Sequence, residues 1–201
     1  MQINNCLVII KQTAMAQGGR AATFARKGDE TAKRILHADR EHKRAVDAAR
    51  RALKSRKIAF AESSIVPFNA ALKRQLAGAD LVVSVGGDGT LLCAAHYVRD
   101  GAVIGVNSAP GDSVGHFCTA DRENFAERLD AILALKWRPV ELARLQVALD
   151  GKTLAELALN DVLITQGRLS SIKTKRLDSS IRHLSACIVC ERLKITPFCP
   201  A

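Results

Sequence analysis

Five consecutive residues combine three glycines with one carboxylate and one hydroxyl: Gly86, Gly87, Asp88, Gly89 and Thr90. They directly follow the apolar run LVVSV, which is typical of a buried strand. Glycines let a ligand approach the backbone closely and can adopt positive φ. A helix beginning at this turn would direct free N–H groups and its positive dipole end at the same place, which favours phosphate. The pattern predicts a turn that holds phosphate groups for phosphoryl transfer.

The single carboxylate in this turn needs an explanation, because an aspartate beside phosphates is repulsive. Asp88 can bind Mg²⁺, hydrogen-bond a ribose hydroxyl, or accept the proton of an attacking hydroxyl. The plainer alternative is a tight turn in which Asp88 only caps the next helix. The segment is neither a GxGxxG loop nor a Walker loop, since no lysine follows the last glycine.

The hydrophobic pattern predicts the elements that position the turn. Short apolar runs predict buried strands at 6–10, 81–85 and 102–106, with a weaker strand at 57–66. Helical spacing predicts helices at 31–57, 69–77 (capped by Asn69), 90–98 and 121–135 (capped by Asp121). Strands that alternate with helices imply a doubly wound parallel α/β sheet up to about residue 137. After Pro139, alternating residues and an Asp150-Gly151 turn indicate the start of a β-rich part.

Composition and charge limit the classes of function. The 201 residues are 48% hydrophobic and 25% charged, and no apolar run approaches the roughly 18 residues of a membrane span. The net charge is +10, but the thirteen Lys/Arg of residues 20–57 are not interleaved with aromatic residues, as a base-stacking surface would require. A solvated helix face or attraction of a polyphosphate explains them better. We therefore expect no nucleic-acid or membrane partner and, without a signal-peptide pattern or disulfide framework, a cytoplasmic location.

Three segments in order resemble one family of kinases. VGGDGTLL, around Asp88, resembles the GGDGT signature that NAD kinases share with diacylglycerol and sphingosine kinases. ALNDVLI, at 158–164, resembles the Asn-acid motif that NAD kinases carry some seventy residues further on. GVNSAPGDSVGHF, at 105–117, resembles a loop of the divergent NAD kinase branch that includes the animal mitochondrial enzymes. The three together cover about residues 80–164.

The resemblance implies a reaction and a set of site residues. NAD kinases transfer the γ-phosphate of ATP, with a divalent metal such as Mg²⁺, to the 2′-hydroxyl of the adenosine ribose of NAD. Asp88 would be the proton acceptor and, with its neighbours Gly86, Gly87, Gly89 and Thr90, would contact the nucleotides. The Asn-acid pair would bind NAD, and Asn107 would line the pocket; here the pair is Asn160 and Asp161. No protein-held metal site is expected.

Two features depart from the family. The divergent branch usually has Asn-Ser/Thr-Asp-Pro where this chain has Asn107-Ser108-Ala109-Pro110. Nothing after Ile164 resembles the family's second Gly-Asp-Gly stretch or its Ser/Thr/Gly-rich segment. We therefore expect a nucleotide-binding α/β domain at 1–137, the truncated start of a β-rich NAD-binding domain at 138–166, and an atypical tail at 167–201.

Three hypotheses about function stay open at this point. The first is an NAD kinase, and the second is a catalytically impaired nucleotide-binding remnant of one. The third, a lipid kinase relative, is disfavoured by ALNDVLI, because lipid kinases tend to place Asn-Glu within a few residues of the turn. NAD kinases are commonly homo-oligomers, but their subunit contacts use the β-rich half that is missing here, so self-association is doubtful.

Overall fold

Three buried strands form the centre of one sheet in the computed structural model, which describes residues 3–18, 30–66, 69–137, 139–149, 152–159 and 184–195. They are β1 (Cys6–Ile10), β3 (Leu81–Gly86) and β4 (Ala102–Asn107). Every residue of β3 and β4 is buried, because helices cover both faces of the sheet. With β2 (Phe60–Ser64) at the edge, the parallel order is β2-β1-β3-β4, which confirms the predicted α/β class.

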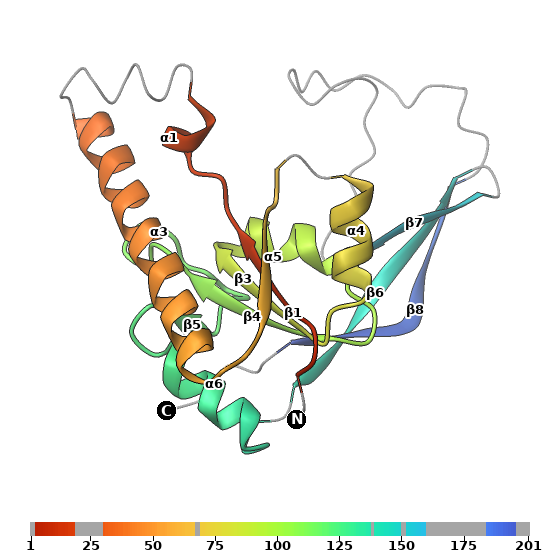
Figure 1. The fold of residues 1–201 in the computed structure, drawn as a ribbon. Helices are drawn as coiled ribbons and strands as arrows, with labels where there is room; N and C mark the ends of the chain where they lie inside the picture. The colour runs from red at the N-terminus through yellow and green to blue at the C-terminus, as the bar shows by residue number, and fades with distance from the viewer. Residues whose placement is uncertain are drawn as a thin grey trace.

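Helices cover the two faces of this sheet in pairs (Figure 1). The pair on one face is α3 (Glu30–Ser55) and α6 (Phe125–Leu133); the other is α4 (Ala70–Ala77) and α5 (Asp88–Ala95). Alternate strand residues divide between two cores, so that Val83 faces α3 and α6 while Val82 faces α4 and α5. The short α1 (Ala14–Gln17) follows β1. This is the doubly wound arrangement that the sequence predicts.

The starts of the helices test the predicted caps. The Asn69 prediction is confirmed, because its side chain accepts the N–H of Leu72 at 2.9 Å. The Asp121 prediction is wrong, because α6 begins later and Asn124 is its N-cap. The Asp121 carboxylate instead accepts the N–H groups of Glu123 at 2.8 Å and of Asn124 at 3.0 Å. An aspartate side chain can accept backbone N–H groups in a turn as well as at the start of a helix. Asp121 does so in the turn that precedes α6.

The C-terminal strands extend the same sheet. β6 (Val140–Leu149) pairs antiparallel with both β7 (Lys152–Ala158) and β8 (Leu184–Ile195), as expected for the start of a β-rich part. β8 also pairs parallel with β4, at Ala102–Lys194 and Val103–Ile195, while β5 (Ala120–Asp121) pairs with the end of β4. The sequence predicts no element in the tail, so β8 is a strand that it missed. The domain boundaries stay a prediction.

In the described part of the chain, none of the helices combines the length and the apolar character needed to cross a membrane.

Candidate functional site

The glycine turn lies where three parallel strands end. Lys11, directly after β1, donates its backbone N–H to the carbonyl oxygen of Val85 at 2.9 Å. Ser108, directly after β4, donates its N–H to the carbonyl oxygen of Gly86 at 2.8 Å. α5 begins at once, and its N-cap, Gly87, offers no side chain to the free N–H groups of the first turn. The turn therefore occupies the carboxyl edge of the sheet, where open α/β folds bind ligands.

The glycines of this turn allow close packing rather than unusual backbone angles. None of Gly86, Gly87 and Gly89 has a positive φ, so this turn does not use the left-handed backbone that glycine permits. A Cβ at Gly86 would overlap the Thr90 side chain and would lie 3.0 Å from Lys11 Cβ. At Gly89 an added Cβ would meet no atom within 4 Å. Packing therefore requires glycine at 86, whereas the backbone around Gly89 is open to a ligand.

Asp88 is the first residue of α5, and its carboxylate holds the loop that follows β4. Oδ2 accepts the N–H of His116 and Oδ1 accepts the N–H of Phe117, each at 2.7 Å. The Cys118 thiol lies beside this carboxylate, and its pKa is raised to about 12, first by burial and then by the charge and hydrogen bond of Asp88. The carboxylate has about four lone pairs, and the two N–H groups and the Cys118 thiol use three of them, so at least one remains for a ligand.

Asn107 holds the other end of the same loop. Its side chain is almost fully buried, at 6% exposure. Oδ1 accepts the N–H of Ala109 at 3.1 Å, and Nδ2 donates to the carbonyl oxygen of Ser113 at 2.9 Å. Gly115 has a φ of +64°, and a Cβ there would overlap the Asn107 amide. Both polar atoms of Asn107 thus bond to the loop, so in this conformation the residue shapes the loop, and its contact with a ligand stays a prediction.

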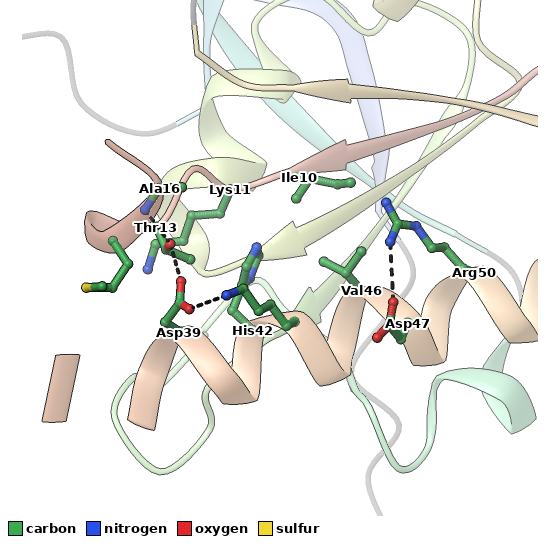
Figure 2. Close-up of a pocket in the computed structure, with 11 residues that line it drawn as sticks. Ile10, Lys11, Thr13, Ala16, Asp39, His42, Val46, Asp47 and Arg50 are labelled. Atoms are coloured by element: carbon green, nitrogen blue, oxygen red, sulfur yellow. Dashed lines mark hydrogen bonds and ion pairs between the residues drawn. The ribbon is translucent and has the colours of Figure 1, made fainter. Parts of the chain in front are cut away.

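A cavity of about 540 Å³ opens on the α3 side of the turn, between the end of β1, α1 and α3 (Figure 2). Thr13 donates its hydroxyl hydrogen to Asp39 Oδ1 at 2.5 Å, and Lys43 pairs with Asp39 at 2.7 Å. His42 is only 5% exposed, and its Nδ1 has no hydrogen-bond partner among the described residues. Burial, and then the charge of Lys11, lower the pKa of His42. A hydrogen bond to the Lys11 backbone raises this pKa, but the net shift is downward. At neutral pH this imidazole is therefore uncharged.

The family model for the ATP-NAD kinase N-terminal domain matches residues 16–136, more than half of the chain. The chain belongs to the NAD kinase family. Its relatives include the "Probable NADH kinase" of Oryza sativa subsp. japonica, 43% identical over 102 residues that cover 43% of this chain and 31% of the relative. The "NAD kinase 2, mitochondrial" of Homo sapiens is 40% identical over 77 residues, which cover 36% of this chain and 17% of the relative. The chain thus spans about a third or less of the length of these two relatives.

The structure brings part of the predicted site together. The turn at 86–90 and Asn107 end adjacent strands, and Asp88 and Asn107 hold the same loop. Asn160 and Asp161 lie outside the described residues, and so does the Asp150-Gly151 turn. In the described ranges, no three His, Cys, Asp or Glu side chains gather closely enough to hold a metal ion.

Sequence reasoning missed the residues of the cavity. Lys11 directly follows a buried strand that ends at the same edge as the glycine turn, which was a usable signal. His42 lies three and four residues before the core residues Ala45 and Val46, so helical spacing places it on the buried face of α3. A polar residue on a buried helix face is the pattern that would have singled out His42.

Proposed function

We propose that this chain is an NAD kinase-like phosphotransferase, which transfers the γ-phosphate of ATP to the 2′-hydroxyl of the adenosine ribose of NAD. One observation carries the proposal: a single carboxylate, Asp88, begins a helix at the carboxyl edge where β1, β3 and β4 end together. Membership of the family supports the choice of substrates. ATP and NAD are thus the proposed ligands.

Asp88 is the proposed proton acceptor. A carboxylate that takes up the hydroxyl proton as the phosphoryl group transfers lowers the barrier, as the base of a kinase does. The two N–H bonds from His116 and Phe117 fix the direction of the carboxylate without using all its lone pairs. A divalent metal fits here as a companion of the ATP phosphates, since Mg²⁺ is usually bound by one or two carboxylates plus substrate oxygens.

The other parts of the proposal come from the family resemblance. Gly86, Gly87, Gly89 and Thr90 would contact the nucleotides, and Asn107 would line the pocket after a rearrangement of its loop. Asn160 and Asp161 would bind NAD. The domain at 1–137 would bind nucleotide, and 138–166 would begin the NAD-binding part. Self-association and the cytoplasmic location stay predictions, and one relative is named as mitochondrial.

A second candidate is a nucleotide-binding remnant without catalytic activity. The resemblance to the divergent branch supports it at one point, because Ala109 stands where that branch usually has an aspartate, so an acidic side chain of the loop is missing. Such a remnant would keep the folded α/β part and its glycine turn.

The two candidates differ in a product assay. Purified chain is incubated with ATP, Mg²⁺ and NAD, and NADP is quantified by chromatography, while calorimetry measures the binding of each nucleotide separately. The proposed function predicts NADP that appears only when all three are present. Nucleotide binding without NADP would favour the remnant. A folded chain that binds neither ATP nor NAD would contradict both candidates.

A further inference from the structure

The outer side of α3 carries a row of cations. Val46, Ala49 and Leu53 are buried on the side that faces the sheet. On the opposite side, exposed residues recur at alternating spacings of four and three, and all but one are Lys, Arg or His: Lys33, His37, Arg40, Arg44, Asp47, Arg51 and Lys54. This spacing keeps them in one line along the helix, which we call the basic ridge.

The basic ridge is only partly neutralised within the described part of the chain. Arg44 pairs with Glu41 at 2.8 Å. Arg40 and Arg51 form no ion pair with any residue that the structure describes. Like charges four residues apart on a helix repel each other, as Arg40 and Arg44 do here. The ridge therefore costs α3 some stability unless an acidic surface faces it.

α6 lies beside α3 on the same face of the sheet and presents the opposite charge (Figure 1). Phe125 and Leu129 are buried on its inner side. Glu127 and Asp130 lie on its outer side, and Glu123, just before the helix, continues their line with the same spacing of four and three. All three carboxylates are exposed, and we call this line the acidic ridge.

The acidic ridge also keeps free charge. Glu127 forms no ion pair with a described residue. Glu123 contacts Arg122 only at 3.7 Å, and its side chain is 79% exposed. Asp130 bonds to Arg56, yet its side chain remains 62% exposed. These carboxylates can therefore accept further cationic partners from outside the molecule.

Two contacts align the ridges. Arg122, just before α6, pairs with Glu41 at 2.7 Å, and Arg56, just after α3, bonds to Asp130 at 2.6 Å. α6 thus lies alongside residues 41–56 of α3, so a positive and a negative ridge run side by side on one surface. A twofold axis between the two helices and perpendicular to this surface would place each ridge on the opposite ridge of a second copy. Such self-complementarity is what a symmetric interface requires.

We propose that this surface joins two copies of the chain in a symmetric dimer, in which the basic ridge of each copy faces the acidic ridge of the other. The contact does not use the β-rich half, on which the expectation of doubtful self-association rests. Exposed ion pairs are individually weak and are screened by salt. The dimer should therefore have a dissociation constant of about 10 µM to 1 mM at low salt.

Sedimentation velocity over a range of concentrations tests the proposal. The parent should associate at low salt and be monomeric in about 1 M salt, where the Debye length is about 3 Å. Arg40→Glu/Arg51→Glu makes both ridges acidic, and Glu123→Lys/Glu127→Lys makes both basic. Each variant alone would face like charges across the axis, so its affinity for itself should fall about tenfold or more.

Arg74→Glu/Lys152→Glu is the matched control. It changes the net charge as much as Arg40→Glu/Arg51→Glu does, but at exposed residues of α4 and β7, away from both ridges. Its affinity for itself should stay within about twofold of that of the parent.

A mixture of the two charge-reversed variants gives the sharpest result. One copy then has two acidic ridges and the other has two basic ridges, so opposite charges meet at both contacts. Both variants keep a net positive charge, so their association requires this local pairing. Association of the mixture, and of the variant that carries all four substitutions, supports the dimer and shows that the reversed chains fold.

Four results would overturn the proposal. They are a parent that stays monomeric at about 1 mM and low salt, self-association that the reversals leave unchanged, an equal loss in the control, and a mixture that stays monomeric. A monomeric parent that binds poly-glutamate through Arg40 and Arg51 would assign the basic ridge to a different acidic protein and would also overturn the dimer.

Discussion

The Asp88 carboxylate has a structural role as well as the proposed chemical one. Its two hydrogen bonds to the backbone of His116 and Phe117 tie the start of α5 to the loop after β4. Asn107 ties the other end of that loop to β4. The loop is therefore fixed by the same residues that the resemblance assigns to ligands, so a change in the loop should alter the site.

Gly115→Ala should destabilise this loop. The new side chain would occupy a backbone with φ of +64° and overlap the Asn107 amide, so we expect the free energy of unfolding to fall by about 1–3 kcal/mol. Gly111→Ala is the matched control, because a Cβ there meets nothing within 4 Å and φ is not in the left-handed region. Urea unfolding of both variants makes the comparison. Equal stabilities would show that the Asn107–Gly115 contact does not constrain the loop.

At the scale of elements, α5 is held at both ends. Arg144, on β6, is buried and its Nη1 donates to the carbonyl oxygens of Ala95 at 2.8 Å and of Val98 at 2.7 Å. The Nδ1 atom of His96 lies 2.8 Å from the carbonyl oxygen of Leu157, on β7. The β6–β7 hairpin thus fixes the C-terminal end of the helix whose first residue is Asp88.

Arg144→Met should weaken this attachment while keeping most of the side-chain volume. The carbonyl oxygens of Ala95, at the end of α5, and of Val98, just after it, would lose a charged donor, so we expect a loss of about 2–4 kcal/mol in the free energy of unfolding. Lys152→Met, on the exposed start of β7, should change it by less than about 0.5 kcal/mol. Thermal and urea unfolding measure both. A loss in Arg144→Met no larger than in the control would contradict the anchoring role.

The pair between α3 and β2 should make stability depend on pH. A hydrogen bond from Arg50 is the main cause that lowers the pKa of Glu62 below its ordinary 4.5. A lowered pKa in the folded state gives stability that is present above 4.5 and is lost as the pH falls through the folded value. The carboxylate is partly exposed, so the contribution is at most about 1 kcal/mol.

Glu62→Gln should therefore be less stable than the parent at pH 7 by up to about 1 kcal/mol, and the difference should vanish at acid pH. Urea unfolding between pH 3 and pH 7, values chosen on either side of the ordinary glutamate pKa, measures it. A difference that stays constant across this range would show that the charge of Glu62 does not contribute.

At the scale of the whole molecule, sequence patterns predicted the parts that depend on local order. β1, β3 and β4 are mostly apolar runs, and the glycine turn follows β3 directly, so their parallel arrangement and the placement of Asp88 could be inferred. The cavity could not, because Lys11 and His42 come from elements whose approach depends on tertiary packing. β8 was missed for a similar reason: its pairing with β4 joins residues such as Ala102 and Lys194, far apart in the chain.

Asn107 shows how a correct position can have an unexpected role. The sequence placed it at the end of a strand beside the turn, and the structure agrees. Its two hydrogen bonds to the loop could not be foreseen, because they depend on the path of residues 109–115 and on the left-handed backbone of Gly115. Loop geometry of this kind is not encoded in hydrophobic periodicity.

The most direct test of the account is the rate of NADP formation by Asp88→Asn, measured together with its affinities for ATP and NAD. The change keeps the size of the side chain but replaces one of the two oxygens that accept N–H groups with an NH2 group, so any loss of nucleotide affinity is measured separately from the loss of rate. Loss of the proton acceptor should lower kcat by about 100-fold or more. Asp112→Asn, a carboxylate in the same loop, should keep the parent rate. Turnover by Asp88→Asn equal to that of the parent would contradict the assignment of Asp88 as the proton acceptor.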